Sequence, residues 1–345
     1  MLQFCVFGAG RMGRKHAASL SALPDVRLRY VVDVEPEAAR NLAAQYGAAV
    51  APDAATALAD PQLDAVIIAT PALSHAELLV ASARAGKAIF CEKPLATSIS
   101  ESLTVAREVR RAEVATCMGF MKRYEPGHYA LHEAIAAGEI GKVEMVVLTN
   151  RDPKVTILGL LKEQHEVAPY TLLRESSVHD FDMARWMLGE EPVEVYVAGS
   201  ALVDAEIAAL GEIDTAMITL KTASGALCQI NSSWRAVYGY DQRVEVFGSE
   251  GMLRAENRPV TSLVRYTRKG AFHDPLLSGP PGSNEFFLYR FAEAYPREMA
   301  LFVDALKTGS RPMCSVEDGL RAQLIVEAAV ESMKTNRPAR VATVA

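Results

Sequence analysis

The residues best suited to chemistry lie around a histidine. In the segment Glu175-Ser176-Ser177-Val178-His179-Asp180-Phe181-Asp182, Glu175 stands four residues before His179 and Asp182 stands three residues after it. Side chains at these spacings share one face of a helix. An imidazole flanked by carboxylates is oriented and made more basic, which suits a general base that removes an alcohol proton. The alternative is a structural histidine near the start of a helix.

A lysine stands where a strand is expected to end. Glu92-Lys93-Pro94 follows the short apolar run Ala88–Cys91. At a strand end that faces an anionic cofactor, the Lys93 ammonium could donate to a substrate hydroxyl and stabilise a developing alkoxide. Because most lysines are solvated surface groups, this role depends on the location of Lys93.

A glycine loop marks a dinucleotide site near the N-terminus. Gly8-Ala9-Gly10-Arg11-Met12-Gly13 fits the G-x-G-x-x-G pattern, directly after a strand pattern and at the start of a helical one. Gly8 permits the tight turn, Gly10 lets the backbone approach the pyrophosphate, and Gly13 allows close packing of helix on strand. The predicted cofactor-binding residues of this loop are Gly8, Gly10, Arg11, Met12 and Gly13.

An acidic residue at the end of the second strand pattern indicates which cofactor binds. Asp33 ends the run Val26–Asp33, at the position where a carboxylate binds the ribose hydroxyls of a dinucleotide. Val34 and Glu35 follow, so no arginine or serine stands there to receive a 2′-phosphate. Because a carboxylate repels that phosphate, the sequence predicts NAD rather than NADP.

Further strand ends are expected to face the same cofactor. Thr70 and Pro71 close the apolar run Asp64–Thr70, and His75 follows soon after. Ligands of parallel α/β sheets bind at the carboxyl ends of the strands. We therefore predict that Thr70, Pro71, His75, Glu92 and Lys93 lie beside the cofactor. His75 could equally be a helix-capping or core histidine.

Strand and helix patterns alternate through the first third of the chain. The expected strands are Leu2–Phe7, Val26–Asp33, Asp64–Thr70, Ala88–Cys91 and Val114–Met118, and the expected helices are Met12–Leu23, Pro36–Tyr46 and Ser74–Ala85. This alternation predicts a doubly wound parallel sheet of the Rossmann type, covered on both faces.

The pattern changes after about Gly138 to a run of strands with one helix, Val178–Leu188. The expected strands are Lys142–Thr149, Val193–Ala198, Thr215–Thr222, Ala226–Ser233, Gln242–Phe247 and Val260–Thr267. Such a run predicts a second, α+β domain with an open-faced antiparallel sheet. The predicted domains are residues 1–122, which bind the dinucleotide, and residues 123–345, which bind the substrate.

The tail returns to helical patterns. Phe286–Lys307 and Val316–Lys334 are predicted helices that pack back on the first domain, and Pro338–Val344 is a predicted final strand. Gly270–Ser283 is rich in glycine and proline and is expected to form a long mobile loop.

Composition restricts the partners. The 345 residues are 50% hydrophobic and carry a net charge of −6 with no basic run, which makes nucleic acid an unexpected partner. No apolar stretch is long enough to cross a bilayer, and Met1–Gly10 lacks the basic start of a signal peptide. The five cysteines are far apart and form no Cys-x-x-Cys pair, which predicts neither disulfides nor a zinc site and favours the cytoplasm.

The chain resembles a known family. The glycine loop, Glu92-Lys93-Pro94 and His179-Asp180-Phe181-Asp182 are similar to the Gfo/Idh/MocA oxidoreductases, and the resemblance runs along nearly the whole chain. It is strongest toward the inositol 2-dehydrogenases of that family, through the stretches Gly119–Tyr124, Arg235–Arg243, Val246–Gly251 and Glu317–Ala322.

The resemblance implies a reaction and its residues. It implies NAD-dependent oxidation of a secondary hydroxyl on a sugar or cyclic polyol to a ketone, with no metal. Lys93 is implied to hold the substrate hydroxyl near the nicotinamide while His179 accepts its proton. Arg123, Asp182 and Tyr238 are implied to contact the substrate, and the sheet face to build a homodimer or homotetramer.

One position departs from the family pattern. Inositol dehydrogenases usually carry aspartate four residues before the catalytic histidine, often after a Gly-Gly pair, whereas this chain has Glu175 and no glycine in Val167–Arg174. Glu175 could pair with His179 from a shifted backbone, contact a differently shaped substrate, or turn outward. We expect retained dehydrogenase chemistry with an altered substrate preference.

Two other functions stay open from the sequence alone. One is a related dehydrogenase that acts on an aldose, an amino-sugar or a dihydrodiol. The other is a non-catalytic protein that senses NAD or a sugar, against which the retention of both Lys93 and His179 argues.

Overall fold

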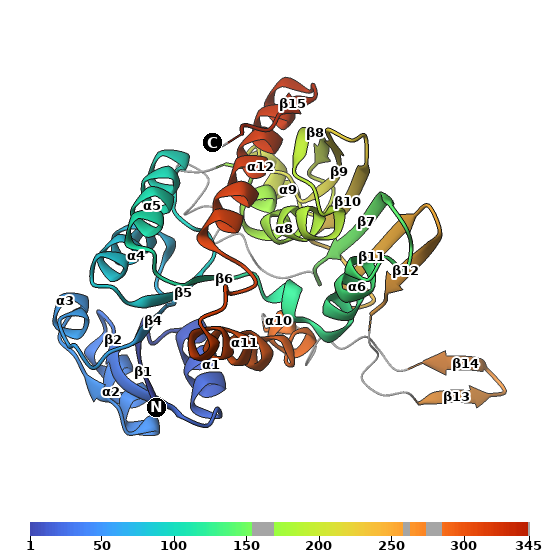
Figure 1. The fold of residues 1–345 in the computed structure, drawn as a ribbon. Coiled ribbons are helices and arrows are strands. Elements are labelled where there is room, and N and C mark those ends of the chain that lie inside the picture. The colour runs from blue at the N-terminus through green and yellow to red at the C-terminus, as the bar shows by residue number, and fades with distance from the viewer. Residues whose placement is uncertain (154–168, 258–262, 274–284, 344–345) are drawn as a thin grey trace. The chain divides into compact units, whose positions relative to one another are not determined.

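The computed structural model describes residues 1–153, 169–257, 263–273 and 285–343 (Figure 1). They form two compact units. The first comprises Met1–Tyr124 and Glu293–Gln323, and the second comprises Glu125–Ala292 and Leu324–Ala345. Among the described residues, no helix is both long and apolar enough to span a membrane.

The first unit is built on a six-stranded parallel sheet. Its strands are β1 (Leu2–Phe7), β2 (Val26–Val32), β3 (Ala49–Val50), β4 (Ala65–Ile68), β5 (Ala88–Glu92) and β6 (Thr116–Gly119). The strand order is β3-β2-β1-β4-β5-β6, so the winding direction reverses between β1 and β4. All four residues of β4 are buried, as expected of a central strand with both faces covered. The predicted doubly wound sheet is confirmed.

Helices cover this sheet. They are α1 (Arg11–Ser21), α2 (Pro36–Tyr46), α3 (Ala54–Leu58), α4 (His75–Arg84), α5 (Ile99–Ala112) and α11 (Ala294–Thr308), with the short turns η1 (Ala72–Ser74) and η2 (Met121–Tyr124). Local sequence sets their ends. Ser98 and Glu101 form a capping box that starts α5. Pro36 starts α2, and Gly47 ends it in the left-handed conformation at φ 64°.

The second unit contains a seven-stranded sheet. Its strands are β7 (Val143–Arg151), β8 (Pro192–Ser200), β9 (Thr215–Thr222), β10 (Leu227–Ser233), β11 (Asp241–Gly248), β12 (Gly251–Ala255) and β15 (Ala339–Arg340), in the order β12-β11-β7-β10-β9-β8-β15. The sequence predicted an antiparallel sheet, but the sheet is mixed because β7 and β10 run parallel. A parallel neighbour requires a long connection, which α8 (Ser177–Leu188), β8 and β9 provide.

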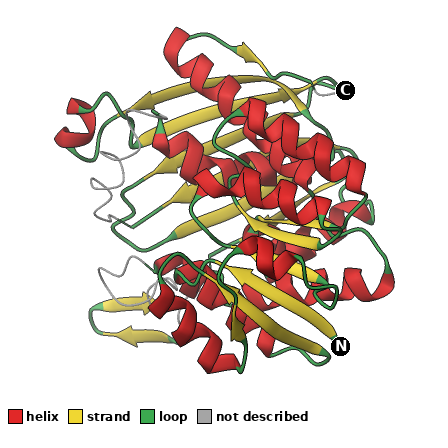
Figure 2. Ribbon diagram, turned by 90° about the vertical axis from the view of Figure 1, so that its left-hand side faces the viewer, coloured by secondary structure: helices red, strands yellow, loops and turns green. Residues whose placement is uncertain are grey.

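The two faces of this sheet differ. Figure 2 shows its strands as one layer with long helices across one face. In β9 the buried residues Ala216, Ile218 and Leu220 alternate with exposed Met217 and Thr219. The helix α8 packs against β7 and β10, while α6 (Pro126–Ala136) packs against β12. The expected open face is thus present.

The predicted helix Phe286–Lys307 is wrong as a single element. It divides into α10 (Phe286–Arg290) in the second unit and α11 in the first. Pro296 lies in the first turn of α11, where proline is tolerated because its missing N–H has no helical partner there. Phe291, between the two helices, is fully buried against His128 and Tyr240.

The remaining elements are small. The helix α9 (Ala205–Ala209) belongs to the second unit, and α12 (Val316–Thr335) follows α11 along the chain. A two-stranded hairpin joins β13 (Val264–Thr267) to β14 (Gly270–His273), so the predicted loop Gly270–Ser283 begins as a strand. Residues 274–284, which include the rest of that loop, residues 258–262 before β13 and residues 344–345 lie outside the described residues.

Candidate active site

The glycine loop connects β1 to α1 by a close approach of backbone to backbone. A Cβ on Gly13 would lie 1.7 Å from the carbonyl oxygen of Gly8, and one on Gly8 would lie 2.5 Å from the carbonyl oxygen of Ala69. Gly8 also has a φ of 95°, which disfavours any other residue. A Cβ on Gly10 meets nothing within 4 Å. Gly8 and Gly13 therefore shape the loop, whereas Gly10 borders open space.

The loop leaves a site for an anion at the start of α1. Gly10 is the N-cap, no side chain caps the helix, and its first turn has no acidic residue. The first N–H groups of a helix and its dipole bind phosphate under these conditions. Arg11 is exposed and Met12 is half-buried beside this loop. These residues fit the pyrophosphate of a dinucleotide.

Asp33 ties the end of β2 to the same loop. Its Oδ2 accepts a hydrogen bond from the Ala9 backbone N–H at 2.5 Å, and its Oδ1 accepts one from the Glu35 N–H at 2.8 Å. A carboxylate has about four acceptor sites, so the two ribose hydroxyls can still be bound. The predicted cofactor carboxylate therefore also fixes the loop.

His75 bridges two loops of the first unit through their backbones. It is buried, its Nδ1 lies 2.7 Å from the Pro94 carbonyl oxygen, and its Nε2 lies 2.9 Å from the Thr70 carbonyl oxygen. The Thr70 hydroxyl accepts a hydrogen bond from Ser74 at 2.7 Å. His75 therefore holds Thr70-Pro71 and Lys93-Pro94 together, which favours the core-histidine alternative over direct contact with a ligand.

Lys93 follows a carboxylate that is itself anchored. Lys93 is half-buried directly after β5, which ends at Glu92. The Glu92 Oε1 lies 2.6 Å from Nε2 of His16, a fully buried residue of α1. A Cβ on Gly119 of β6 would lie 3.0 Å from the Glu92 Oε2, so a side chain at position 119 would press on the carboxylate.

In the second unit, an unusual helical turn carries Glu175. Leu172–Ser176 form a π-helix that runs directly into α8. Such turns are rare, add a residue to the helical repeat and are frequent at functional sites. Tyr170, just before the turn, has a left-handed φ of 66°. Glu175 is therefore carried by a backbone that departs from the regular α-helix.

A buried glutamate fixes the start of this turn. The Glu212 carboxylate accepts hydrogen bonds from the backbone N–H groups of Tyr170 and Thr171, both at 3.0 Å, and from the Thr171 hydroxyl at 3.2 Å. Arg174 forms two hydrogen bonds to Glu327. These hydrogen bonds hold Tyr170 and Thr171 just before the turn and Arg174 within it.

His179 lies in the first turn of α8, and only 9% of its surface is exposed. Its neighbour Asp180 accepts a hydrogen bond from Asn150 Nδ2 at 2.5 Å, and Gln242 donates to the Asn150 amide oxygen. Trp234 Nε1 donates to the Ser176 hydroxyl at 3.1 Å. Residues of two strands, β7 and β11, and Trp234 directly after β10 therefore fix the segment that presents His179.

Two residues that were predicted to contact the substrate are buried and interact with other groups of the protein. Asp182 is fully buried, and its Oδ1 lies 3.5 Å from Arg185 Nη1. Arg123, in the first unit, donates to the Met313 carbonyl oxygen at 3.0 Å and to Asp318 at 3.1 Å. Both residues hold helices in place, whatever contact with substrate they also make.

Tyr238 is the exposed member of the predicted substrate residues. Its hydroxyl donates to Asp241 at 2.6 Å and accepts from Arg151 at 3.1 Å. Burial and the hydrogen bond to Asp241 raise the pKa of Tyr238. Hydrogen bonds from Arg243, Tyr238 and Asn257 lower the pKa of Asp241 although burial opposes them. Tyr238 is therefore a neutral phenol held in a fixed orientation.

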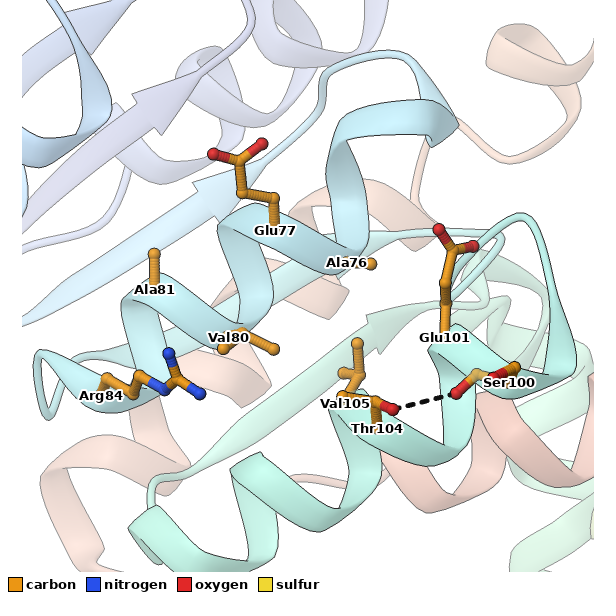
Figure 3. A pocket seen from close by; sticks show the side chains of 9 residues that line it. All are labelled: Ala76, Glu77, Val80, Ala81, Arg84, Ser100, Glu101, Thr104 and Val105. Carbon is orange, nitrogen blue, oxygen red and sulfur yellow. Dashed lines mark hydrogen bonds between the residues drawn. The ribbon is translucent and has the colours of Figure 1, made fainter.

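The described residues offer little support for a second functional site. In the described ranges no cluster of three or more His, Cys, Asp or Glu side chains could hold a metal ion, and all five cysteines are buried. A groove of about 390 Å³ between α4 and α5 has Glu77 and Arg84 on one side and Glu101 and Thr104 on the other (Figure 3). No predicted site residue lines it.

Sequence reasoning missed several residues that position the site. His16 stands on the buried stripe of α1 with Gly13, Ala17 and Leu20, so a polar residue at an apolar position was the available signal. Glu212, Asn150 and Gln242 act through partners far along the chain, for which one sequence carries no signal.

Comparisons with known proteins agree with this geometry. Residues 2–120 match the family model described as "Oxidoreductase family, NAD-binding Rossmann fold", and residues 128–254 match "GFO/IDH/MocA C-terminal domain". The chain is 40% identical to an inositol 2-dehydrogenase of Rhizobium meliloti, with 99% of each chain covered. It is 30% identical to a scyllo-inositol 2-dehydrogenase (NAD(+)) of Bacillus subtilis, covering 97% of this chain and 95% of the other. The structure of a myo-inositol dehydrogenase from Corynebacterium glutamicum is 30% identical, with a TM-score of 0.90 and 100% of both chains covered.

The glycine loop allows a paired test. Replacing Gly13 by alanine forces α1 away from β1 and is expected to cost about 1–3 kcal/mol or more of unfolding free energy. Gly10→Ala should leave the unfolding free energy within about 1 kcal/mol of the unaltered protein and weaken NAD binding, because its methyl group enters the space of the pyrophosphate. Denaturant unfolding and NAD titration by fluorescence measure both effects. Equal NAD affinity in Gly10→Ala and the unaltered protein would contradict the assignment of the loop.

Proposed function

The chain belongs to the Gfo/Idh/MocA oxidoreductase family, and from that premise we propose that it oxidises a ring hydroxyl of an inositol or similar cyclic polyol to a ketone with NAD. The observation that carries this proposal is the joint presence of the NAD loop, the strand-end Lys93 and the buried His179 in a chain 40% identical over its full length to an inositol 2-dehydrogenase.

We assign the chemical roles to the chain's own residues. The bound dinucleotide supplies the hydride acceptor. His179 takes the hydroxyl proton as general base, and the polar contacts of Asp180 and Ser176 keep its segment in place. The Lys93 ammonium stabilises the developing alkoxide, and the Tyr238 oxygen, whose proton is donated to Asp241, can accept a hydrogen bond from a substrate hydroxyl. Glu175 is proposed to orient His179.

The cofactor preference follows from Asp33. Its carboxylate is fixed between the Ala9 and Glu35 N–H groups, so it cannot turn away from a 2′-phosphate without losing both hydrogen bonds. NADP is therefore disfavoured.

The open sheet face supports a proposed homodimer or homotetramer. Met252, Phe247, Met145 and Leu227 pair in register across β12, β11, β7 and β10. They form an exposed apolar row, with 49%, 45%, 40% and 43% of their surfaces accessible. A contiguous apolar row of this kind marks a protein interface.

The central prediction concerns turnover. The assay is the initial rate of reduced cofactor formation at alkaline pH with myo-inositol, scyllo-inositol, aldoses and sugar acids, each tested with NAD and with NADP. We expect turnover of an inositol with NAD and a much slower rate with NADP. His179→Ala should lower kcat by about 10²–10⁴-fold and Lys93→Ala by about 10²–10³-fold, because each removes a group that acts in the transition state. Lys334→Ala, an exposed lysine of α12, is the matched control and should retain full activity. NAD binding without turnover of any member would count against a dehydrogenase of polyols.

A second prediction concerns Glu175. Because the π turn positions the longer side chain, Glu175→Asp should draw the carboxylate back and lower kcat about tenfold or more, with the KM for NAD unchanged. Glu175→Gln, which keeps the length and removes the charge, separates the effect of reach from that of charge. A rise in kcat/KM for myo-inositol in Glu175→Asp would instead assign Glu175 to substrate selection.

A third prediction concerns assembly. Phe247→Lys places a charge in the centre of the apolar row and should convert the oligomer to a smaller species, because desolvating an unpaired charge is costly. Leu202→Lys changes an exposed leucine outside the row and serves as the control. Sedimentation velocity of the unaltered protein and both variants measures the change. An unchanged mass in Phe247→Lys would place the interface elsewhere.

A further inference from the structure

The first unit contains a buried acid that the proposed reaction does not use. Glu298 of α11 is fully buried, and neither of its carboxyl oxygens has a hydrogen-bond partner. An unpaired buried carboxylate is among the most unfavourable groups in a protein interior. Its location therefore requires an explanation.

The helix α11, which carries Glu298, packs against α1 and η2 and reaches β5 through an aromatic contact. Tyr295, Glu298 and Phe302 are three and four residues apart, so they share one face of the helix. The Tyr295 ring lies 6.1 Å from the His16 ring, and the Phe302 ring lies 6.0 Å from that of Phe90 on β5. Glu298 therefore lies between contacts to α1 and to β5, on the side of the His16–Glu92 pair.

Within that pair, the protonation state is set by the hydrogen bonds. His16 Nε2 lies 2.6 Å from the Glu92 carboxylate, whereas His16 Nδ1 is buried with no partner. We therefore assign the donated proton to Nε2 and the lone pair to Nδ1, because an unpaired acceptor is less costly than an unpaired charged donor. Nε2 thus donates to the Glu92 carboxylate, whose charge also acts on Glu298.

The elements packed against α11 carry cations, which are Arg11 and Lys15 on α1 and Lys122 and Arg123 on η2, but the influences on the Glu298 carboxyl itself are burial and the Glu92 charge. The titratable groups that interact electrostatically with Glu298 are Glu92 of β5, Cys117 of β6, Tyr124 of η2 and Tyr295 of α11. Burial raises the pKa of Glu298 well above its ordinary value, and the Glu92 charge raises it further. Burial also raises the pKa values of the Cys117 thiol and of both tyrosines, so these three neighbours are neutral.

We propose that Glu298 is a positioning residue of the dehydrogenase reaction, which acts as a neutral carboxylic acid that keeps Glu92 ionised and bonded to His16, and thereby keeps the adjacent Lys93 in place. This inference rests on the proposed function for its catalytic part. Ionisation of Glu298 adds a second negative charge beside Glu92 in an apolar interior. Either Glu92 then takes up a proton and its hydrogen bond to His16 weakens, or α11 separates from β5.

The proposal fixes the sign of a pH dependence. The pKa of Glu298 is raised in the folded chain, so the stabilisation is complete below the ordinary glutamate pKa and is lost as the pH rises toward the folded value. Across that window, the unfolding equilibrium constant should increase about tenfold per pH unit from this one proton.

Denaturant unfolding of the full chain tests the protonation state. It should be measured between about pH 5 and pH 8 for the unaltered protein, Glu298→Gln and Asp304→Asn, an exposed acid of the same helix. Glutamine mimics the neutral acid, so Glu298→Gln should flatten the dependence by about tenfold per pH unit, while Asp304→Asn should leave it intact. The same slope in all three proteins would overturn the proposal.

Kinetics test the positioning role. Glu298→Gln should keep kcat/KM for the polyol within about threefold near neutral pH and move the alkaline loss of kcat/KM to higher pH, because the neutral state is now permanent. A loss above about tenfold in Glu298→Gln, restored in Glu298→Asp, would mean that the ionised form is required and would overturn the proposal. The unfolding measurement needs no turnover. Missing turnover in the unaltered protein with the slope present therefore counts against the polyol dehydrogenase, whereas a missing slope counts against Glu298 alone.

Discussion

The close approach of α1 to β1 is the constraint on which the first unit depends. Only glycine at position 13 lets the helix lie against the Gly8 carbonyl, and this contact sets where the rest of α1 lies. One turn further along, the same helix delivers His16 to Glu92 at the end of β5. A single steric requirement thus places both the phosphate-binding helix end and the histidine that anchors the carboxylate before Lys93. The glycine fingerprint therefore organises more of the unit than its loop.

The sheet of the second unit differs from that of the first, because it has one covered face and one open face. The covered face carries polar side chains at the strand ends, where Asn150 and Gln242 reach the start of α8 and hold Asp180. Buried polar groups are costly unless they are paired, so this network has one satisfied arrangement and fixes the register of α8 against the sheet. The open face carries the apolar row. The proposed general base and the proposed assembly surface therefore lie on opposite faces of one sheet.

The sequence predicted what depends on local pattern and missed what depends on distant partners. The glycine loop, the parallel strands and α2 were predicted because periodicity and turn residues are local signals. The parallel pairing of β7 with β10 and the division of Phe286–Lys307 were not, because both are decided by tertiary contacts. The π turn at Glu175 depends on Glu212, which lies 41 residues from Thr171 along the chain. The departure from the family pattern at Glu175 was the one local signal of that shifted backbone.

Three buried glutamates show why Glu298 differs from an ordinary structural acid. Glu212 is surrounded by three donors from one segment. Glu125 accepts from Arg290 at 3.0 Å and from the His128 N–H at 2.8 Å, and although burial raises its pKa, His128 and Arg290 bring it below the ordinary value. Neither carboxyl oxygen of Glu298 has a hydrogen-bond partner, and both burial and the like charge of Glu92 raise its pKa. Because the same fold supplies partners to the first two acids, the environment of Glu298 is one that suits a neutral group, and the charge beside Lys93 is left to Glu92 alone.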